Sequence, residues 1–274
     1  MKFIDFENGR VPALGFGTFD IRGADCVRAT TMALEIGYRH IDTAQEYNNE
    51  SEVGRAINGS AVDRGEIFLT TKIWPNRIGH GELQHAAQES LDRLATPYVD
   101  LLLIHWPSPT IPLGESLAAL AAVKAAGKAM HIGISNFPIS LMREAVETHG
   151  AGVVCNQVEY HPFLDQRRLI DGARARGLFV TAYSPLAQGD VDGYPTLDAI
   201  ARKHVKTPAQ VTLRWLVDQD GVAAIPKAAS ARHCRANFDI FDFTLSDADR
   251  LVIDGLRGLR RMVSPDFAPE WDTP

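Results

Sequence analysis

Short apolar runs alternate with amphipathic stretches from near the start of the chain to about residue 226. Several runs are continuously apolar, and residues 99–104 are apolar except for Asp100. Parallel strands that are buried on both faces have this pattern. The alternation predicts strands at residues 13–19, 40–44, 67–73, 99–106, 130–136, 153–159, 179–184 and 222–226.

The stretches between the predicted strands have helical spacing. One of them, residues 81–94, places on one face Leu83, Ala87, Leu91 and Leu94. Residues 118–126 are followed by Gly127, and residues 141–148 are followed by Gly150. Glycine at this position is typical of a helix C-cap. The run Thr207-Pro208-Ala209-Gln210 has the form of a capping box with proline at the first helical position.

Eight strand-then-helix units in one series predict a (β/α)8 TIM barrel, with auxiliary helices and a C-terminal loop over the barrel mouth. We expect residues 1–274 to form this single barrel domain. The alternative is an open doubly wound sheet, which carries its dinucleotide fingerprint after the first strand. The one candidate for that fingerprint, Leu14-Gly15-Phe16-Gly17-Thr18, lacks the third glycine. The barrel is therefore favoured.

Composition narrows the possible partners and the compartment. The chain has 274 residues and a net charge of −6 without a basic run, which argues against nucleic acid as a partner. Its three cysteines are far apart and form no CxxC pair, which suits a reducing cytoplasm better than a disulfide framework. No apolar run approaches the roughly 18 residues of a membrane span, and Asp5 interrupts the start where a signal peptide needs apolar residues. We expect a cytoplasmic protein with no membrane partner.

Polar side chains occur where most of the predicted strands end. These residues are Asp42, Lys72, His105, Ser135, Asn136, Asn156, Gln157, Tyr183 and Ser184. In a parallel barrel the carboxyl ends of the strands meet at one face, where function gathers. Each residue alone also has a structural explanation: an aspartate after a strand is commonly a cap or turn residue, and a histidine beside Trp106 is commonly a satisfied polar group.

Lys72 is harder to explain structurally, because an unpaired ammonium group near the barrel mouth is costly. Asp42 on the neighbouring strand is its expected partner. Tyr47 follows Asp42 by five residues, in a loop where an ordinary surface tyrosine is the alternative. A nearby ammonium group should lower the pKa of the phenol from its usual value of about 10. That arrangement suits proton transfer to a carbonyl oxygen, which His105 would orient or help to protonate.

These residues and the segments around them resemble the motifs of the aldo-keto reductases. The resemblance covers nearly the whole chain, in the right order and spacing. Its motifs are residues 42–50 (DTAQEYNNE), 71–74 (TKIW), 104–107 (IHWP), 133–137 (GISNF), 156–162 (NQVEYHP), 183–186 (YSPL) and 225–227 (IPK). One such motif is weak support, but seven in series make independent structural explanations implausible.

The resemblance implies a role for each matching position. Tyr47 is the general acid in reduction, Lys72 and Asp42 tune it, and His105 orients the carbonyl. The implied cofactor is NADPH, with NADH use possible, and no metal is implied. The cofactor contacts it implies are Ser135, Asn136 and Gln157 at the carboxamide, Tyr183 on the ring, Gly17, Thr18 and Asp42 along the cofactor, Ser184 and Leu186 near the pyrophosphate, and Lys227 and Ser230 at the 2′-phosphate.

One position departs from the family pattern. Many members carry an arginine six residues beyond the lysine that corresponds to Lys227, and this chain has His233 there, preceded by Arg232. Arginine presents a rigid fork to phosphate, whereas a neutral histidine replaces only part of that interaction. We therefore expect the preference for NADPH over NADH to be weaker than usual, with Lys227 and Arg232 retaining some of it.

The substrate pocket should be lined by Phe19, Trp74 and Trp106, whose alternative is plain core packing. The tail at residues 262–271 has the composition of a disordered segment, but its two aromatic residues favour packing across the mouth as a short loop. The tail and the chain length resemble bacterial members that reduce 2,5-diketogluconate, methylglyoxal and similar small dicarbonyls. We expect a monomer that reduces such small-molecule carbonyl substrates.

Two other functions remain open from the residues themselves. A Schiff-base aldolase on the same barrel would use Lys72 as its nucleophile, but it would leave Ser135, Asn136, Gln157 and the Lys227 segment without a purpose. A non-catalytic sensor or regulatory subunit would bind NADPH without turnover, and fold alone does not exclude it.

Overall fold

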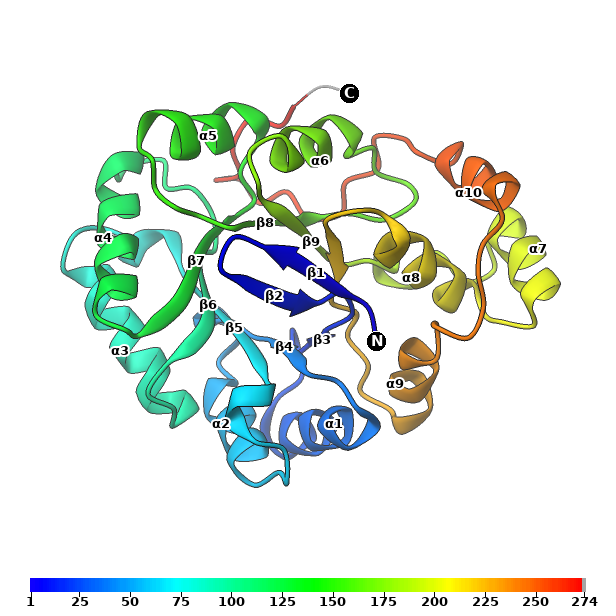
Figure 1. Ribbon diagram of the computed structural model, residues 1–274, viewed down its shortest axis with the longest axis horizontal. Coiled ribbons are helices and arrows are strands. Elements are labelled where there is room, and N and C mark those ends of the chain that lie inside the picture. Colours follow the sequence, from blue (N-terminus) through cyan, green and yellow to red (C-terminus); the bar gives the residue numbers. More distant parts are fainter. Residues whose placement is uncertain (273–274) are drawn as a thin grey trace.

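A parallel barrel forms the centre of the computed structural model, which describes residues 1–272 (Figure 1). Its eight strands follow one another in sequence order around the sheet. They are β3 (Phe16–Gly17), β4 (His40–Asp42), β5 (Phe68–Ile73), β6 (Val99–Ile104), β7 (Ala129–Ser135), β8 (Cys155–Glu159), β9 (Phe179–Tyr183) and β10 (Val222–Ala224). Parallel bridges from Leu14 to Ala224 and from Gly17 to Lys227 join the first segment to the last. The predicted barrel is confirmed, and the open doubly wound sheet is wrong.

Helices surround the barrel (Figure 1). They are α1 (Gly23–Ile36), α2 (Glu50–Asn58), α3 (Glu82–Leu94), α4 (Leu113–Ala125), α5 (Ile139–Arg143), α6 (Arg167–Arg174), α7 (Pro195–His204), α8 (Pro208–Asp218), α9 (Ala231–Phe238) and α10 (Asp247–Asp254). Both α7 and α8 lie between β9 and β10, and α10 packs on α7, so α7 and α10 are the auxiliary helices. Over residues 1–272, no helix combines the length and apolarity that crossing a membrane requires.

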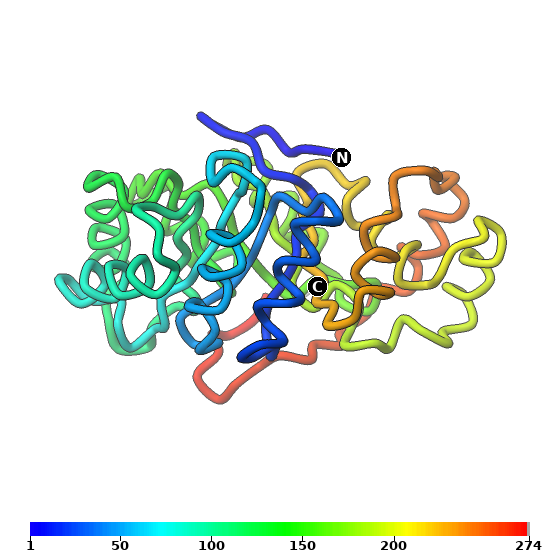
Figure 2. Tube along the Cα trace, turned by 90° about the horizontal axis from the view of Figure 1, so that it is seen from below, coloured from blue at the N-terminus to red at the C-terminus, as the bar shows by residue number. Residues whose placement is uncertain are grey.

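A hairpin that we did not predict closes the bottom of the barrel. It consists of β1 (Phe3–Phe6) and β2 (Gly9–Pro12), and it lies on the side of the molecule opposite the C-terminal segment (Figure 2). The ring of Phe6 packs 5.0 Å from that of Phe179 and 4.8 Å from that of His131. The Asn8-Gly9 pair, with Asn8 at a φ of 62°, is the hairpin signal in the sequence.

The sequence signals located the helices correctly but did not give the bounds of all of them. The capping box is confirmed, since the Thr207 hydroxyl accepts from the Gln210 amide at 3.2 Å and the Gln210 side chain accepts from the Thr207 amide at 3.0 Å. The helix predicted at residues 118–126 begins earlier, at Leu113. The one predicted at residues 141–148 divides into α5 and a π-helical turn, Glu144–Thr148.

Burial on both faces sets the environment of the strand ends. All six residues of β5 are buried although three of them are polar, and Lys72 is among them with none of its surface exposed. A charged amine in such surroundings must be paired. Its partners define the candidate site.

Candidate active site

The polar strand ends meet at the barrel mouth, as the parallel topology requires. Strand β4 pairs with β5 and β7 pairs with β8 in parallel register, with Asp42 beside Thr70 and Ser135 beside Gln157. Asp42, Lys72, Ser135, Asn136 and Gln157 are all buried there, His105 is 8% exposed, and Tyr183 is partly exposed. Side chains from six strands are thereby concentrated at one end of the barrel.

The ammonium group of Lys72 makes three interactions. Its Nζ donates to Asp42 Oδ1 at 2.5 Å and to the Thr43 carbonyl oxygen at 2.8 Å. The third contact, at 3.4 Å, is with the hydroxyl of Tyr47. The predicted Asp42–Lys72 pair is therefore confirmed, and it lies directly against the phenol. The Thr43 contact was not predicted, because a backbone carbonyl leaves no signal in the residue type.

Tyr47 is held over the mouth by the loop that follows β4. It ends a short 3-10 turn, Gln45–Tyr47, and Asn48 then adopts a left-handed conformation with a φ of 53°. Asn49 fixes this loop from inside: it accepts from the Thr43 hydroxyl at 2.7 Å and donates to the carbonyl oxygens of Thr18 and Ile21 at 2.9 Å. Tyr47 is consequently not a free surface tyrosine.

Burial outweighs the ammonium group in its effect on the pKa of Tyr47. Desolvation raises this pKa, the charge of Lys72 lowers it, and the charge of Asp42 raises it again, so the net shift is upward from 10. Our expectation of a net lowered pKa is therefore wrong, since it left out the burial of the phenol. The pKa of Lys72 is lowered by burial, but Asp42 and Tyr47 raise it by more. At neutral pH the phenol is protonated and the amine is charged.

His105 enters the site as a neutral ring. Burial, and next the charge of Lys72, hold its pKa well below 6.5. Its ring lies 5.8 Å from that of Tyr47 and 5.1 Å from that of Trp74, and its backbone amide donates to the Ile73 carbonyl at 3.0 Å. A neutral imidazole orients an oxygen by hydrogen bonding and holds no spare proton to share. Of the two roles that we considered for His105, the geometry favours orientation.

An amide network links the strand ends to the carboxylate of Asp42. The side-chain amide of Gln157 donates to Asp42 Oδ2 at 2.8 Å, and the Ser135 hydroxyl donates to the backbone carbonyl oxygen of Gln157 at 2.9 Å. The Asn136 amide donates to the His105 carbonyl oxygen at 2.9 Å, while its Oδ1 accepts from the Tyr183 hydroxyl at 2.8 Å. The residues predicted to contact the nicotinamide therefore also support the residues predicted to move the proton.

The residues predicted along the rest of the cofactor lie at or just after the ends of β3 and β9. Thr18 is buried and donates its hydroxyl to the Asp42 carbonyl oxygen at 2.9 Å. Gly17 lies where the first strand segment meets the last, and a Cβ atom at this position would be 2.7 Å from the Ile225 carbonyl oxygen. Ser184 and Leu186, just after β9, are both partly exposed. Gly17 and Thr18 thus have structural roles beside their predicted ones.

After β10, the N-terminus of α9 is exposed and cationic. The Ser230 hydroxyl caps the helix by accepting from the His233 amide at 3.2 Å. Arg232 and His233 are exposed in the first turn. Lys227 is 45% exposed, with its Nζ 3.9 Å from Asp20. A helix N-terminus beside a lysine and an arginine is suited to a phosphate group.

Aromatic side chains wall the mouth beside His105. The Trp74 and Trp106 rings lie 5.6 and 5.7 Å from that of Phe267, and Trp106 also packs 6.0 Å from Trp271. Phe19 is 62% exposed and packs at 5.1 Å on Tyr47. The tail that carries Phe267 and Trp271 is thus packed on the mouth, as its aromatic residues indicated, and the composition-based expectation of disorder is wrong.

Comparison with known proteins decides the family. Residues 13–257 match the Aldo/keto reductase family. Methylglyoxal reductase DkgB of Yersinia pestis is 41% identical over 266 residues, covering 96% of this chain and 99% of the relative. Morphine 6-dehydrogenase of Pseudomonas putida is 38% identical over 282 residues, covering 96% and 93%. The chain belongs to the aldo-keto reductase family.

Solved structures agree with this assignment. A crystal structure provisionally named 2,5-diketo-D-gluconic acid reductase B superposes with a TM-score of 0.94 at 46% identity, covering 96% of this chain and 94% of that one. The aldose reductase of Schistosoma japonicum superposes with a TM-score of 0.92 at 30% identity, covering 98% and 99%. As an aldo-keto reductase, the chain is an oxidoreductase of a family that uses nicotinamide cofactors to reduce carbonyl groups.

Proposed function

We propose that this aldo-keto reductase reduces small aldehydes and ketones to alcohols, with NADPH as the hydride source and Tyr47 as the proton donor. The observation that carries the proposal is the 3.4 Å contact between the Tyr47 hydroxyl and a fully buried, aspartate-paired Lys72. A lysine held in that way stabilises negative charge on the phenolic oxygen as its proton leaves.

The donors and acceptors of the site fit a nicotinamide dinucleotide. The amides of Asn136 and Gln157 and the hydroxyl of Ser135 complement a carboxamide, and the ring of Tyr183 offers a flat surface for stacking. At the other end, Lys227 and the capped N-terminus of α9 match a phosphate in charge and donor geometry. When bound, the nicotinamide supplies the hydride.

The protein's own groups then manage the proton. Neutral His105 holds the carbonyl oxygen of the substrate by a hydrogen bond, near the Tyr47 hydroxyl. Tyr47 is protonated at neutral pH, as a phenol with a pKa at or above the usual 10 must be, and burial raises this pKa further. It donates its proton to that oxygen as the negative charge develops. Lys72 stabilises the resulting phenolate, and Asp42 keeps Lys72 in place.

For the substrate, we infer small α-dicarbonyl compounds such as methylglyoxal or 2,5-diketogluconate. Relatives at 41 and 46% identity carry the names of reductases for these two compounds. The aromatic wall of Trp74, Trp106 and Phe267 stands close to His105, which suits a small substrate held over the mouth.

We further infer that NADPH is preferred only modestly over NADH. His233 stands in the first turn of α9, where many family members have an arginine, and its ring lacks the guanidinium fork. A ratio of kcat/KM values that favours NADPH by several thousandfold would contradict this inference. The three cysteines are buried free thiols, which supports a reducing, cytoplasmic location, and we propose a monomer that size-exclusion chromatography with light scattering can test.

The test is a panel of small aldehydes, ketones and α-dicarbonyls, assayed for oxidation of NADPH and of NADH. Carbonyl-dependent loss of absorbance, stopped by Tyr47→Phe, is expected. Binding of NADPH with no turnover on any carbonyl would favour the regulatory-subunit alternative. Trapping of substrate on Lys72 by borohydride would favour the aldolase, against which the raised pKa of this amine already argues, since a Schiff base needs the neutral form.

A further inference from the structure

A second buried carboxylate lies at the mouth, outside the proton-transfer group. Glu159 is the last residue of β8 and has no exposed surface. Its Oε1 accepts from the backbone amide of Met262 at 2.7 Å, and its Oε2 accepts from that of Val263 at 2.8 Å. Glu159 belongs to the 156–162 motif, yet none of the steps proposed above uses it. Its interactions point instead to the C-terminal tail.

His161 completes this carboxylate cluster. Its Nδ1 accepts from the Phe163 amide at 3.3 Å, so the proton of a neutral ring is on Nε2, which donates to Glu159 Oε1 at 2.9 Å. The carboxylate of Glu159 therefore faces three N–H donors. An ionised carboxylate only accepts hydrogen bonds and matches all three, whereas an amide would turn an N–H group toward at least one of them.

The anchored segment leads directly to the wall of the substrate pocket. Arg261, next to the first anchored amide, lies with its guanidinium 3.7 Å from the centre of the Trp271 ring. Trp271 packs on Trp106, and Phe267 packs on both Trp74 and Trp106. Trp74 in turn packs on His105. Residues 262–263 are thus one point at which the barrel fixes the aromatic part of the tail; Asp272, which accepts from the Ile139 amide at 2.8 Å, is another.

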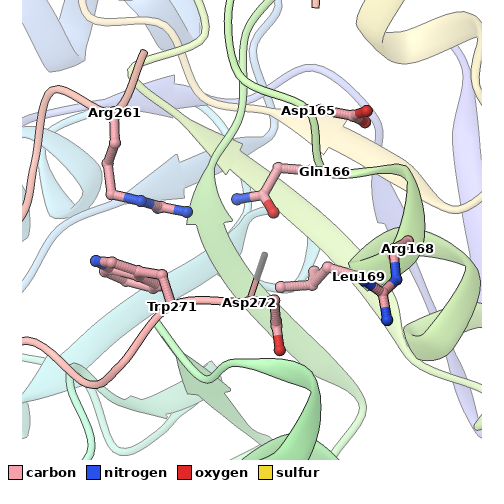
Figure 3. A pocket seen from close by; sticks show the side chains of 7 residues that line it. All are labelled: Asp165, Gln166, Arg168, Leu169, Arg261, Trp271 and Asp272. Atoms are coloured by element: carbon pink, nitrogen blue, oxygen red, sulfur yellow. The ribbon is translucent and has the colours of Figure 1, made fainter. Parts of the chain in front are cut away.

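Figure 3 shows how the tail lies against the loop after β8: Arg261 and Trp271 are neighbours, and Gln166 points toward them. The Gln166 amide donates to the Glu159 carbonyl oxygen at 2.9 Å. The cavity enclosed among these residues is about 20 Å³, room for about one water molecule. The tail is therefore seated closely against this loop.

We propose that Glu159 is a positioning residue for substrate binding: its carboxylate fixes residues 262–263 and so places Phe267 and Trp271 as one wall of the carbonyl pocket. This inference rests on the proposed carbonyl reduction. Because Glu159 touches neither the Tyr47 hydroxyl nor Lys72 in the hydrogen bonds of the described residues, its loss should affect KM for the carbonyl and leave kcat nearly unchanged.

The anchor can be broken from either side. Glu159→Gln replaces an acceptor oxygen by an amide, and Val263→Pro removes the N–H that donates to Oε2. Each should raise KM for the carbonyl about tenfold, the effect of losing one buried hydrogen bond to a charged group. Val263→Ala keeps the N–H and is the matched control. Asp249→Asn is the control for a buried carboxylate, since Asp249 caps α10 and accepts from Lys203 and His204.

A readout that needs no activity is trypsin cleavage of the Arg261–Met262 bond, whose amide is the one bound to Glu159. Glu159→Gln and Val263→Pro should lose the tail several-fold faster than the wild type and both controls, as measured by mass spectrometry. The double variant should show no larger KM than either single variant, because both break one anchor. Since Val263→Pro leaves the barrel interior unchanged, it keeps the test valid if Glu159→Gln fails to fold.

Unchanged KM and unchanged cleavage in Glu159→Gln and Val263→Pro would overturn the inference. Additive KM effects in the double variant would also overturn it, because Glu159 would then act independently of the tail. Failure of the wild-type chain to reduce any carbonyl would instead reject the proposed function. The cleavage rates would still decide whether Glu159 anchors the tail.

Discussion

Two lysine–aspartate pairs lie at opposite ends of the proposed cofactor site, and they differ in burial and in the distance between their charged groups. Lys72 is fully buried, and its Nζ lies 2.5 Å from Asp42. Lys227 is 45% exposed, and its Nζ lies 3.9 Å from an Asp20 that is itself 65% exposed. The first pair is fixed by the barrel, while the second is a loose surface contact.

The difference explains which part of the site can vary. Removing one partner from a buried pair leaves an uncompensated charge, so neither residue of the Asp42–Lys72 pair can change alone. An exposed pair contributes little to stability, so Lys227 is free to exchange Asp20 for a phosphate. We therefore expect the buried pair, Asp42 and Lys72, to serve the chemical step. The exposed Lys227 should serve the selection between NADPH and NADH.

The sharpest way to test the buried end is to remove the phenolic proton. Tyr47→Phe should lower kcat for carbonyl reduction by about 10³-fold, the usual loss for a missing general acid. NADPH affinity, measured by fluorescence titration, should stay nearly unchanged. Tyr160→Phe is the control, because Tyr160 is a hydrogen-bonded tyrosine whose hydroxyl donates to Gln219. Full activity in Tyr47→Phe would refute the assignment.

Breaking the pairs themselves compares the two ends directly. Lys72→Met should lower the free energy of unfolding by about 3–5 kcal/mol, because it leaves Asp42 buried and unpaired. It should also lower kcat by about 10²-fold, since the phenolate loses its stabilising charge. Lys227→Met should leave the unfolding midpoint unchanged. Urea denaturation of both variants measures the contrast, and equal destabilisation would contradict it.

The exposed end should respond through cofactor choice alone. His233→Arg should raise the ratio of kcat/KM for NADPH over NADH about tenfold, as expected for one added guanidinium contact with phosphate. His85→Arg is the control, because His85 is an exposed histidine near the start of another helix, α3. A change in kcat that is common to both cofactors would mean that the exposed end also takes part in the chemistry.

The smallest expected effect concerns pH: kcat for carbonyl reduction should hardly change around neutral pH. Reduction needs protonated Tyr47, whose pKa burial raises above 10, so the rate should fall only at pH values above that. It also needs neutral His105, whose pKa is held well below 6.5 by burial and by the charge of Lys72, so the acid limb should lie below that value. We expect kcat to change less than about twofold from pH 7 to 9. A limb centred near pH 7 would show that another group controls the step.

Strand positions were the easiest feature to predict, because several of the buried parallel strands leave a nearly continuous apolar run in the sequence. The same runs located the polar strand ends, and the structure brings Asp42, Lys72, His105, Asn136 and Gln157 together as expected. The errors lie in elements outside these runs, and one of them, the hairpin, has a clear Asn8-Gly9 signal in the sequence. The β1–β2 hairpin was overlooked, and α5 breaks into a π-helical turn that residue spacing does not reveal.

The tail illustrates a different limit. Its composition suggested disorder, whereas its two aromatic residues suggested packing. What holds it is a carboxylate about 100 residues earlier in the chain, which binds backbone amides rather than side chains. A contact of that kind leaves no periodicity and no residue pattern near the tail itself.

By itself, the sequence determined the barrel and the set of polar residues at its mouth, because both follow from the period of buried strands and the shared direction of their ends. Only the tertiary structure decided the protonation states and the anchoring of the tail. The pKa of Tyr47 depends on burial by segments distant in the chain as well as on Lys72 and Asp42. Desolvation is a property of the whole surroundings of a group, and no local pattern of residues contains it.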